Sequence, residues 1–190
     1  DAARLRWSRG PTGLTMGTAP TPRSIEPGRL PRQVLVMGVS GCGKSSVGSA
    51  LAERLGWRFV DADDYHPAAN VDKMRAGLPL DDQDRAPWLD RLNALLRHSA
   101  ARDQPVVLAC SALRERYRER LSHRLPGLAI VHLRGDFETI AARLAARTHR
   151  YMPPTLLRSQ FDTLESPGPP AIDIDIGQSL EAIVATLFKQ

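Results

Sequence analysis

One short segment of the chain combines residue types and a spacing that suit phosphate binding. Residues 38–45 match the pattern G-x-x-x-x-G-K-[ST]. Its glycines let successive backbone N–H groups turn inward around phosphate oxygens, and the N-terminus of a following helix adds roughly half a positive charge there. Lys44 would reach the β- and γ-phosphates, and the Ser45 hydroxyl would bind Mg²⁺. The residues predicted to hold the nucleotide are Gly38, Val39, Ser40, Gly41, Cys42, Gly43, Lys44, Ser45 and Ser46.

The residues around this segment supply the elements that it needs. The apolar run 34–37 precedes it and predicts a buried strand, while Val47, Leu51 and Leu55 recur behind it at helical spacing. A chance glycine-rich turn is the alternative, but it would not require strand, loop and helix in this order. The sequence therefore predicts a protein that binds a nucleoside triphosphate.

An acidic cluster follows the next predicted strand, 57–60. Asp61 and Asp63 stand two residues apart, so in an extended chain both would project to the same side, toward the phosphates. One could orient hydrated Mg²⁺, and the other could accept the proton of an attacking hydroxyl. A solvated acidic turn is the alternative interpretation, and a neighbouring phosphate loop favours the catalytic one. Asp61 is the predicted metal ligand together with Ser45.

Length and charge limit the class of protein. A chain of 190 residues is enough for one well-buried domain and short for two. The first 32 residues hold six arginines, and the remainder carries 20 basic and 19 acidic residues. We therefore predict a disordered leader or upstream extension over 1–32 and a folded domain over 33–190. The nearly neutral domain argues against nucleic acid as a partner.

Cysteine usage and hydropathy indicate the setting of the protein. Cys42 and Cys110 show no C-x-x-C spacing and no accompanying histidine cluster, so neither a zinc site nor a disulfide framework is predicted. No run approaches the ~18 apolar residues that cross a bilayer. These features suit a cytoplasmic protein that has no membrane contact.

Apolar β-type runs alternate with helical patterns along the rest of the chain. Strands are predicted at 34–37, 57–60, 106–110, 128–133 and 172–176. Helices are predicted around 44–55, 70–75, 88–96, 113–121, 137–144, 156–164 and 180–187, the third with Pro87 in its first turn. This alternation predicts an α/β fold, a five-stranded parallel sheet with helices on both faces. Ligands of such sheets bind outside the carboxyl ends of the strands, so residues 38–45, 61–64, 110–112 and 135–136 should meet in one cleft.

Several longer segments resemble the gluconokinases of the small, shikimate-kinase-like type. The resemblance runs from about Gln33 to the C-terminus, and its specific segments are H-P-A-A-N at 66–70, P-L-D-D-Q-D-R-A-P-W-L at 79–89, C-S-A-L at 110–113 and S-Q-F-D-T-L-E at 159–165. It implies transfer of the γ-phosphate of ATP to the 6-hydroxyl of D-gluconate. It also implies a P-loop, nucleoside-monophosphate-kinase-like three-layer fold with a mobile lid, and a homodimer.

The implied substrate explains the charged residues of these segments. Gluconate is a small polyhydroxylated carboxylate, and its site needs cations for the carboxylate and polar side chains for the hydroxyls. Asp63 is the predicted general base and also a substrate contact, by resemblance and by position. As alternatives, Arg118 could be a helix-surface charge and His66 could cap a turn. The further predicted substrate contacts are Lys73, Arg85 and Arg118 for the carboxylate, and His66, Asp81 and Ser111 for the hydroxyls.

The predicted lid segment contains Arg143, Arg147, His149 and Arg150. The family commonly reads R-x-G-H-F-M where this chain reads R-T-H-R-Y-M at 147–152, so either His149 or Arg150 takes the family's histidine role. Arg147 is predicted to be catalytic, as a cation that stabilises charge on the transferring phosphoryl group.

Two other functions stay open from the residues. A related kinase could act on another sugar acid or on shikimate. A nucleotide-dependent regulatory module without phosphotransfer is the second, and the set Lys44, Ser45, Asp61 and Asp63 argues against it.

Overall fold

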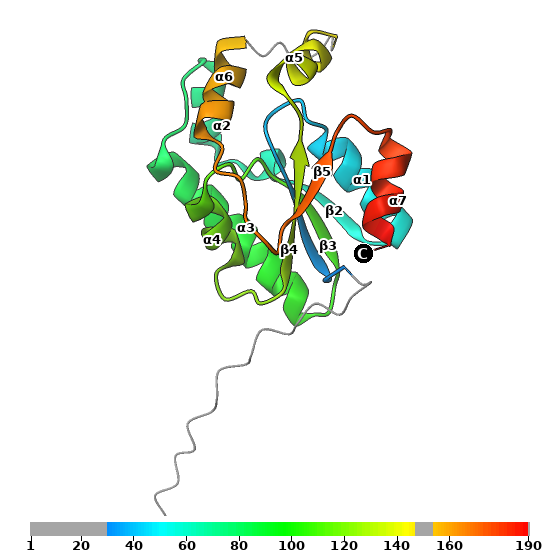
Figure 1. The fold of residues 1–190 in the computed structure, drawn as a ribbon. Coiled ribbons are helices and arrows are strands. Elements are labelled where there is room, and N and C mark those ends of the chain that lie inside the picture. Colours follow the sequence, from blue (N-terminus) through cyan, green and yellow to red (C-terminus); the bar gives the residue numbers. More distant parts are fainter. Residues whose placement is uncertain (1–29, 147–153, 190) are drawn as a thin grey trace, which may run out of the picture.

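The computed structural model describes residues 30–146 and 154–189. Its centre is one parallel sheet in the strand order β2-β3-β1-β4-β5 (Figure 1). The strands are β1 (Gln33–Met37), β2 (Arg58–Asp61), β3 (Val106–Ala109), β4 (Leu128–Arg134) and β5 (Ile172–Asp175). Each overlaps the run predicted for it, so the prediction of a five-stranded parallel sheet is confirmed.

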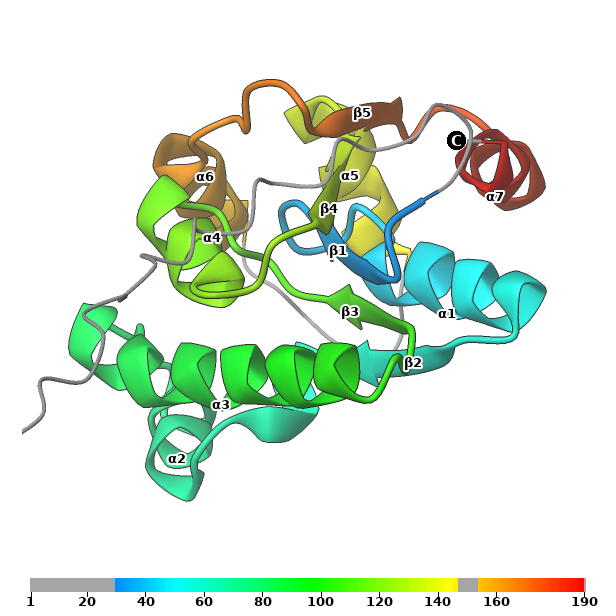
Figure 2. The ribbon, with the colours of Figure 1, turned by 90° about the horizontal axis from the view of Figure 1, so that it is seen from below.

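Helices cover both faces of this sheet. They are α1 (Lys44–Leu55), α2 (Ala68–Arg75), α3 (Asp82–Ala101), α4 (Glu115–Ser122), α5 (Phe137–Ala145), α6 (Pro154–Thr163) and α7 (Leu180–Phe188), with a short 3-10 helix, η1 (Ala62–Tyr65). Helices α3 and α4 pack on one face of the sheet, and α1 and α7 pack on the opposite face (Figure 2). The three-layer prediction is therefore confirmed. None of the helices described is both long and apolar enough to span a membrane.

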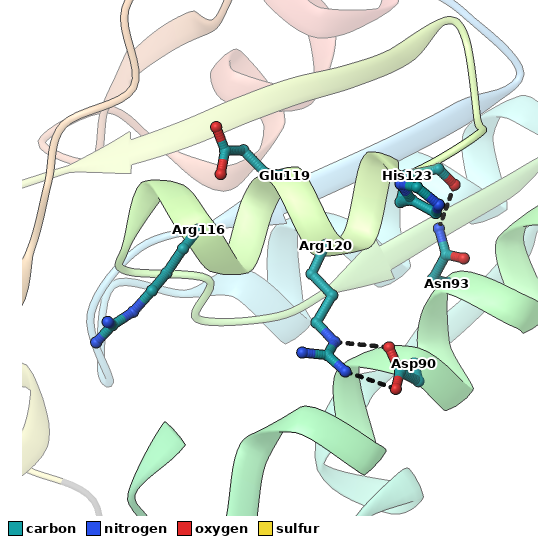
Figure 3. Close-up of a pocket in the computed structure, with 6 residues that line it drawn as sticks. All are labelled: Asp90, Asn93, Arg116, Glu119, Arg120 and His123. Carbon is teal, nitrogen blue, oxygen red and sulfur yellow. Dashed lines mark hydrogen bonds and ion pairs between the residues drawn. The ribbon is translucent and has the colours of Figure 1, made fainter. Parts of the chain in front are cut away.

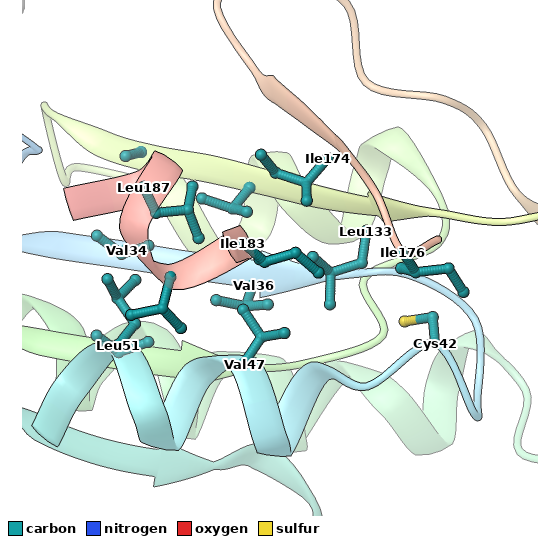
Figure 4. Close-up of a cluster of buried hydrophobic side chains, with 14 of the residues drawn as sticks. Val34, Val36, Cys42, Val47, Leu51, Leu133, Ile174, Ile176, Ile183 and Leu187 are labelled. Carbon is teal, nitrogen blue, oxygen red and sulfur yellow. The ribbon is translucent and has the colours of Figure 1, made fainter. Parts of the chain in front are cut away.

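The central strand β1 places the phosphate loop. All five of its residues are buried, as expected for the interior strand of a parallel sheet. Val34 and Val36 face the apolar cluster under α1 and α7 (Figure 4), while Leu35 and Met37 face the cluster under α3. Because both faces are packed, the end of β1 is a rigid base for the loop that follows.

Helix α3 begins earlier than its apolar pattern predicts. It begins at Asp82, so Pro87 lies in the second turn and the prediction of Pro87 in the first turn was wrong. The reason is a capping box: Asp81 Oδ1 accepts the N–H of Asp84 at 2.8 Å, and Asp84 Oδ2 accepts the N–H of Asp81 at 3.0 Å. These reciprocal bonds start the helix nearly two turns ahead of its first buried residue, Trp88.

The folded body reaches slightly beyond the predicted domain boundary. Leu30 is 7% exposed and belongs to the core beside β1. The carbonyl of Arg32 accepts the N–H of Val106 at 2.8 Å, and its guanidinium pairs with Asp103 at 2.9 Å. Residues 30–32, assigned to the leader from the sequence, thus contact the domain. Residues 1–29 lie outside the described part of the chain.

A buried histidine at the β4–β5 edge makes stability depend on pH. His132 is 2% exposed, and its Nδ1 lies 2.9 Å from Asp173 Oδ1. Burial lowers the pKa of His132 below its usual 6.5, although Asp173 acts in the opposite direction. The unfolded chain then binds this proton more readily than the folded one, so the free energy of unfolding should rise with pH just below 6.5.

We expect His132→Gln to flatten this part of the pH profile. Glutamine can still donate to Asp173 but does not titrate. Urea unfolding between about pH 5 and 7.5 measures the slope. His98→Gln, which removes an exposed histidine, is the matched control and should keep the wild-type slope. An unchanged slope in His132→Gln would contradict the assignment.

Candidate active site

The phosphate loop has the backbone that its glycines allow. Gly38 has φ 142°, and a Cβ there would lie 2.8 Å from the carbonyl oxygen of Leu133. Gly43, at φ 102°, precedes the first residue of α1. Lys44 Nζ donates to the carbonyl of Val39 at 3.1 Å, so the lysine folds back over the loop. The loop and its lysine therefore have the shape that phosphate binding requires.

Hydrogen bonds join this loop to the acidic cluster behind β2. Ser45 Oγ donates to Asp61 Oδ2 at 2.7 Å, and Asp61 Oδ1 accepts the N–H of Asp63 at 3.1 Å. Asp61 thus ties the first turn of α1 to the residue predicted as general base. Ser45 and Asp61 together form a pair of oxygen donors of the kind that holds Mg²⁺ beside phosphates and water. Among the described residues, no group of three or more His, Cys, Asp or Glu side chains could hold a metal ion, so phosphate and water oxygens would have to complete the coordination.

The reason given for the proximity of Asp61 and Asp63 was wrong, although the two residues do lie together. Strand β2 ends at Asp61, and Asp63 lies in the 3-10 helix η1. The two residues are therefore not residues i and i+2 of one strand, whose side chains would point to the same side. Asp61 instead caps η1 by accepting the N–H of Asp63, which is why the two acids are adjacent.

Charged groups from three segments meet around the end of β3. Cys110 is 2% exposed, and burial raises the pKa of its thiol to about 12. The same thiol lies within electrostatic range of Lys44, Asp63 and Arg85, of which the two cations lower its pKa and the acid raises it. The phosphate-loop lysine, the predicted base and a predicted substrate cation thus all lie within electrostatic range of one buried thiol. Of the segments expected to converge, 38–45, 61–64 and 110–112 are thus represented here, whereas Gly135 and Asp136 line a separate hollow with Val39.

His66 is held by two neighbours. Its ring stacks on Trp88 with centroids 4.1 Å apart and an interplanar angle of 15°, and Asn70 Nδ2 lies 3.5 Å from its Nδ1. Burial lowers the pKa of His66, and Asp63 opposes that shift. A neutral ring with Nδ1 facing an amide donor presents Nε2–H as a hydrogen-bond donor. Trp88 itself is 2% exposed and donates to the carbonyl of Ala62 at 2.8 Å, so it is a core residue that supports the site.

Two of the predicted substrate residues already have protein partners. Lys73 Nζ contacts both carboxylate oxygens of Asp84, at 2.7 and 2.8 Å, and this contact raises the pKa of Lys73. Asp81 caps α3 with its side chain. Asp84 connects the two, and Asn70 Nδ2 also binds its carbonyl at 2.8 Å. Sequence reasoning did not assign Asp84 to the site, although its spacing from Asp81 is the capping-box signal.

Arg85 has a different environment. Its guanidinium lies 5.7 Å from the centroid of the Tyr117 ring. The carboxylate of Asp82 already has two other partners: one oxygen accepts a hydrogen bond from the Tyr117 hydroxyl at 2.5 Å, and the other forms an ion pair with Arg116 at 2.6 Å. Within the described residues, Arg85 takes part in no ion pair, so its charge is available to a ligand.

Arg118 is not a surface charge. It is 6% exposed, and its Nη1 donates to the carbonyls of Ala112 at 3.0 Å and Leu113 at 3.1 Å. The alternative interpretation as a solvated helix charge is therefore wrong. Ser111, beside this loop, accepts the N–H of Gly38 through its carbonyl at 3.4 Å. Arg118 thus stabilises the loop that touches the phosphate loop.

Comparison with known proteins agrees with this geometry. Residues 40–162 match the shikimate kinase family. A probable gluconokinase from Mus musculus is 46% identical over 178 residues, which cover 84% of this chain and 97% of that protein. The crystal structure of a gluconokinase from Sinorhizobium meliloti superposes with a TM-score of 0.74 at 45% identity, covering 83% of this chain and 89% of that one. The chain belongs to the gluconokinase family.

The gluconokinase segment S-Q-F-D-T-L-E at 159–165 connects two loops of the site. Gln160 contacts Ser40 of the phosphate loop. Glu165 Oε2 accepts the N–H of Glu115 at 2.6 Å, and its own N–H donates to the carbonyl of Leu113 at 2.9 Å. Sequence reasoning quoted this segment for the resemblance but assigned none of its residues to the site.

The predicted lid residues lie mostly outside the described residues. Arg147, His149 and Arg150 all fall in 147–153. Arg143 is described. Its Nη2 donates to the carbonyl of Ile176 at 2.6 Å, and its positive charge acts to lower the pKa of the Cys42 thiol in the phosphate loop. It lies at the edge of the gluconokinase phosphate loop, in α5.

The described part of the chain contains two hollows of similar size. One, about 420 Å³, lies beyond the carboxyl ends of β4 and β5 and is lined by Val39, Gly135, Asp136, Ile176 and Gly177 among others. The other, about 400 Å³, is a surface groove between α3 and α4 (Figure 3). Arg120 pairs there with Asp90 at 2.6 Å, and Asn93 donates to the carbonyl of His123 at 2.9 Å. The α3–α4 groove contains none of the predicted gluconokinase site residues.

Proposed function

We propose that this protein transfers the γ-phosphate of ATP to the 6-hydroxyl of D-gluconate, giving 6-phosphogluconate and ADP. The observation that carries the proposal is the hydrogen-bonded series Ser45, Asp61 and Asp63. It supports a role for the Asp63 carboxylate as acceptor of the hydroxyl proton, next to the loop proposed to hold the triphosphate. Family membership supports gluconate as the acceptor.

Each residue near the loop has a task in this reaction. Backbone N–H groups of residues 38–45 hold the phosphate oxygens, and Lys44 neutralises charge on the β- and γ-phosphates. Ser45 and Asp61 would hold Mg²⁺, which when bound neutralises the phosphates and orients them for transfer.

The bond changes follow from the position of Asp63. The 6-oxygen of gluconate forms a bond to the γ-phosphorus while the bond from that phosphorus to the bridging oxygen of ADP breaks. Asp63 accepts the proton that leaves the 6-hydroxyl and later releases it to solvent. His66, with Nε2–H as a donor, would bind a hydroxyl of the sugar chain, and Ser111, whose carbonyl accepts the N–H of Gly38, would bind another through its side chain.

Arg85 is the cation best suited to the gluconate carboxylate. A guanidinium matches a carboxylate with two parallel hydrogen bonds, which an ammonium cannot do. Lys73 is bound by Asp84 and Arg118 by loop carbonyls, whereas Arg85 is in no ion pair among the described residues. We infer that Lys73 and Arg118 contribute indirectly. Lys73 holds Asp84, and Arg118 holds the loop of Ala112 and Leu113.

We expect Arg85→Lys to raise the KM for gluconate about tenfold, through loss of the second hydrogen bond. The KM for ATP should change little, because the phosphate loop is untouched. Steady-state kinetics with each substrate varied in turn measures both. Arg97→Lys, an exposed substitution on the same helix, is the control. Equal changes in the two KM values would contradict this assignment.

A coupled ADP-release assay with gluconate and Mg·ATP tests the proposed function. Absence of turnover in well-folded protein would refute it. A panel of sugar acids and shikimate distinguishes the closest alternative, because a site that hydrogen-bonds hydroxyls rejects analogues lacking them by large factors.

The assembly and location belong to the same proposal. We propose a homodimer, which the family resemblance implies, and a cytoplasmic location, which suits the cysteine usage. Met74 and Leu78, on and just after α2, are 44% and 55% exposed and offer apolar surface for a second copy. Light scattering on the purified protein measures the oligomeric state.

A further inference from the structure

Gln160, on α6, forms two hydrogen bonds with Ser40 of the phosphate loop. The N–H of Ser40 donates to Gln160 Oε1 at 2.7 Å, and Gln160 Nε2 donates to Ser40 Oγ at 3.1 Å. The two residues are 120 positions apart in the sequence. A carboxamide therefore spans the backbone and the hydroxyl of the same serine.

The polarity of this contact is determined by the backbone. The N–H of Ser40 is only a donor, so the carboxamide must present its oxygen to it. The NH₂ group then faces Ser40 Oγ, and because an NH₂ group only donates, the hydroxyl must accept there. The hydroxyl proton of Ser40 is left to point away from Gln160. Phosphate oxygens only accept, so a hydroxyl in this state is ready to donate to them.

We propose that Gln160 is a positioning residue that makes the Ser40 hydroxyl a hydrogen-bond donor to the triphosphate. This role deepens the proposed function and depends on its use of ATP. Gln160 acts through Ser40 and selects which way the hydroxyl proton points.

The surroundings of Gln160 keep its carboxamide in place. On the same helix, Leu157 is 1% exposed and the Phe161 ring meets Phe137 edge to face, with centroids 5.7 Å apart. Just after that helix, Glu165 accepts the N–H of Glu115. The part of α6 that carries Gln160 is thus anchored on both sides, which lowers the entropy cost of orienting the side chain.

Gln160→Glu reverses the polarity with almost no change in shape. One carboxylate oxygen still accepts the N–H of Ser40, but the other now accepts the hydroxyl proton, which is then lost to the phosphate. Gln160→Leu removes both bonds without adding charge. We expect Gln160→Leu to raise the KM for ATP about tenfold and Gln160→Glu to raise it further, with the KM for gluconate within about twofold of wild type.

The pairing with Ser40 is tested by a double-mutant cycle. Ser40→Ala removes the hydroxyl, so the effect of Gln160→Glu on the KM for ATP should shrink clearly in that background. Gln104→Leu, an exposed glutamine at the opposite end of β3, is the matched control and should behave as wild type. Independent, multiplicative effects of the two substitutions, or equal shifts in both KM values, would overturn the proposal.

The same variants separate this proposal from the proposed function. Calorimetric titration with Mg·ATP alone measures nucleotide binding without any acceptor. If wild type binds ATP but does not turn over gluconate, the proposed function fails while the Gln160 comparison still applies. If wild type turns over gluconate and Gln160→Glu binds ATP as tightly as wild type, only the role of Gln160 fails.

Discussion

Asp63→Asn is expected to lower kcat by ~10²–10⁴-fold, the range that a general base contributes. Asparagine fills the same space and leaves the N–H of residue 63 free to bind Asp61, so η1 should keep its cap. The lost capacity is acceptance of the proton from the attacking hydroxyl. Single-turnover measurements with saturating gluconate and Mg·ATP report this loss directly.

Asp64→Asn is the matched control for this variant. It removes the same charge at the next residue, which is exposed, and it should keep near-wild-type turnover. Circular dichroism and a thermal melt establish that both variants are folded. Turnover near wild type in Asp63→Asn would remove Asp63 as the base and direct attention to other carboxylates of the cleft.

Lys44→Ala is expected to lower kcat by ~10²–10³-fold, the cost of deleting one electrostatic contact to a developing charge. The lysine returns over the loop to the carbonyl of Val39, a position from which its ammonium can reach the phosphates. Its loss should weaken ATP binding as well, because the triphosphate loses a cation in both the ground state and the transition state.

Kinetics and calorimetry together measure these two effects for Lys44→Ala. Lys189→Ala, at the exposed C-terminal end of α7, removes a lysine far along the chain from the loop and should have neither effect. If Lys44→Ala kept wild-type kcat, the phosphate-loop assignment itself would be contradicted.

The strand and helix pattern was predictable because it is local. Residues 34–37 form a buried strand, since an apolar run followed by glycines has few other stable arrangements in a domain of this size. The end of α1 at Leu55 likewise follows from Gly56, which takes the left-handed conformation at φ 67°. The start of α3 was missed because its capping box lies outside the apolar pattern that predicted the helix.

The candidate site was predictable where a sequence motif has a characteristic local backbone shape. The phosphate-loop pattern predicted the loop over which Lys44 folds back, and the structure joins Ser45 by a hydrogen bond to Asp61, the other predicted metal ligand. Arg118 could not be judged in this way. A sequence pattern does not reveal whether a charged residue of a short helix faces water or the carbonyls of a neighbouring loop.

The sequence by itself determined the number and order of the helices and strands and the nucleotide loop, because each depends on residues close together in the chain, and it indicated the family through several separate motifs. Only the tertiary structure decided the strand order, the engagement of Lys73 by Asp84 and the contact of Gln160 with Ser40. These features join residues that approach each other when the sheet and its helices pack. Their distances depend on how the layers fit, which no local spacing of residues encodes.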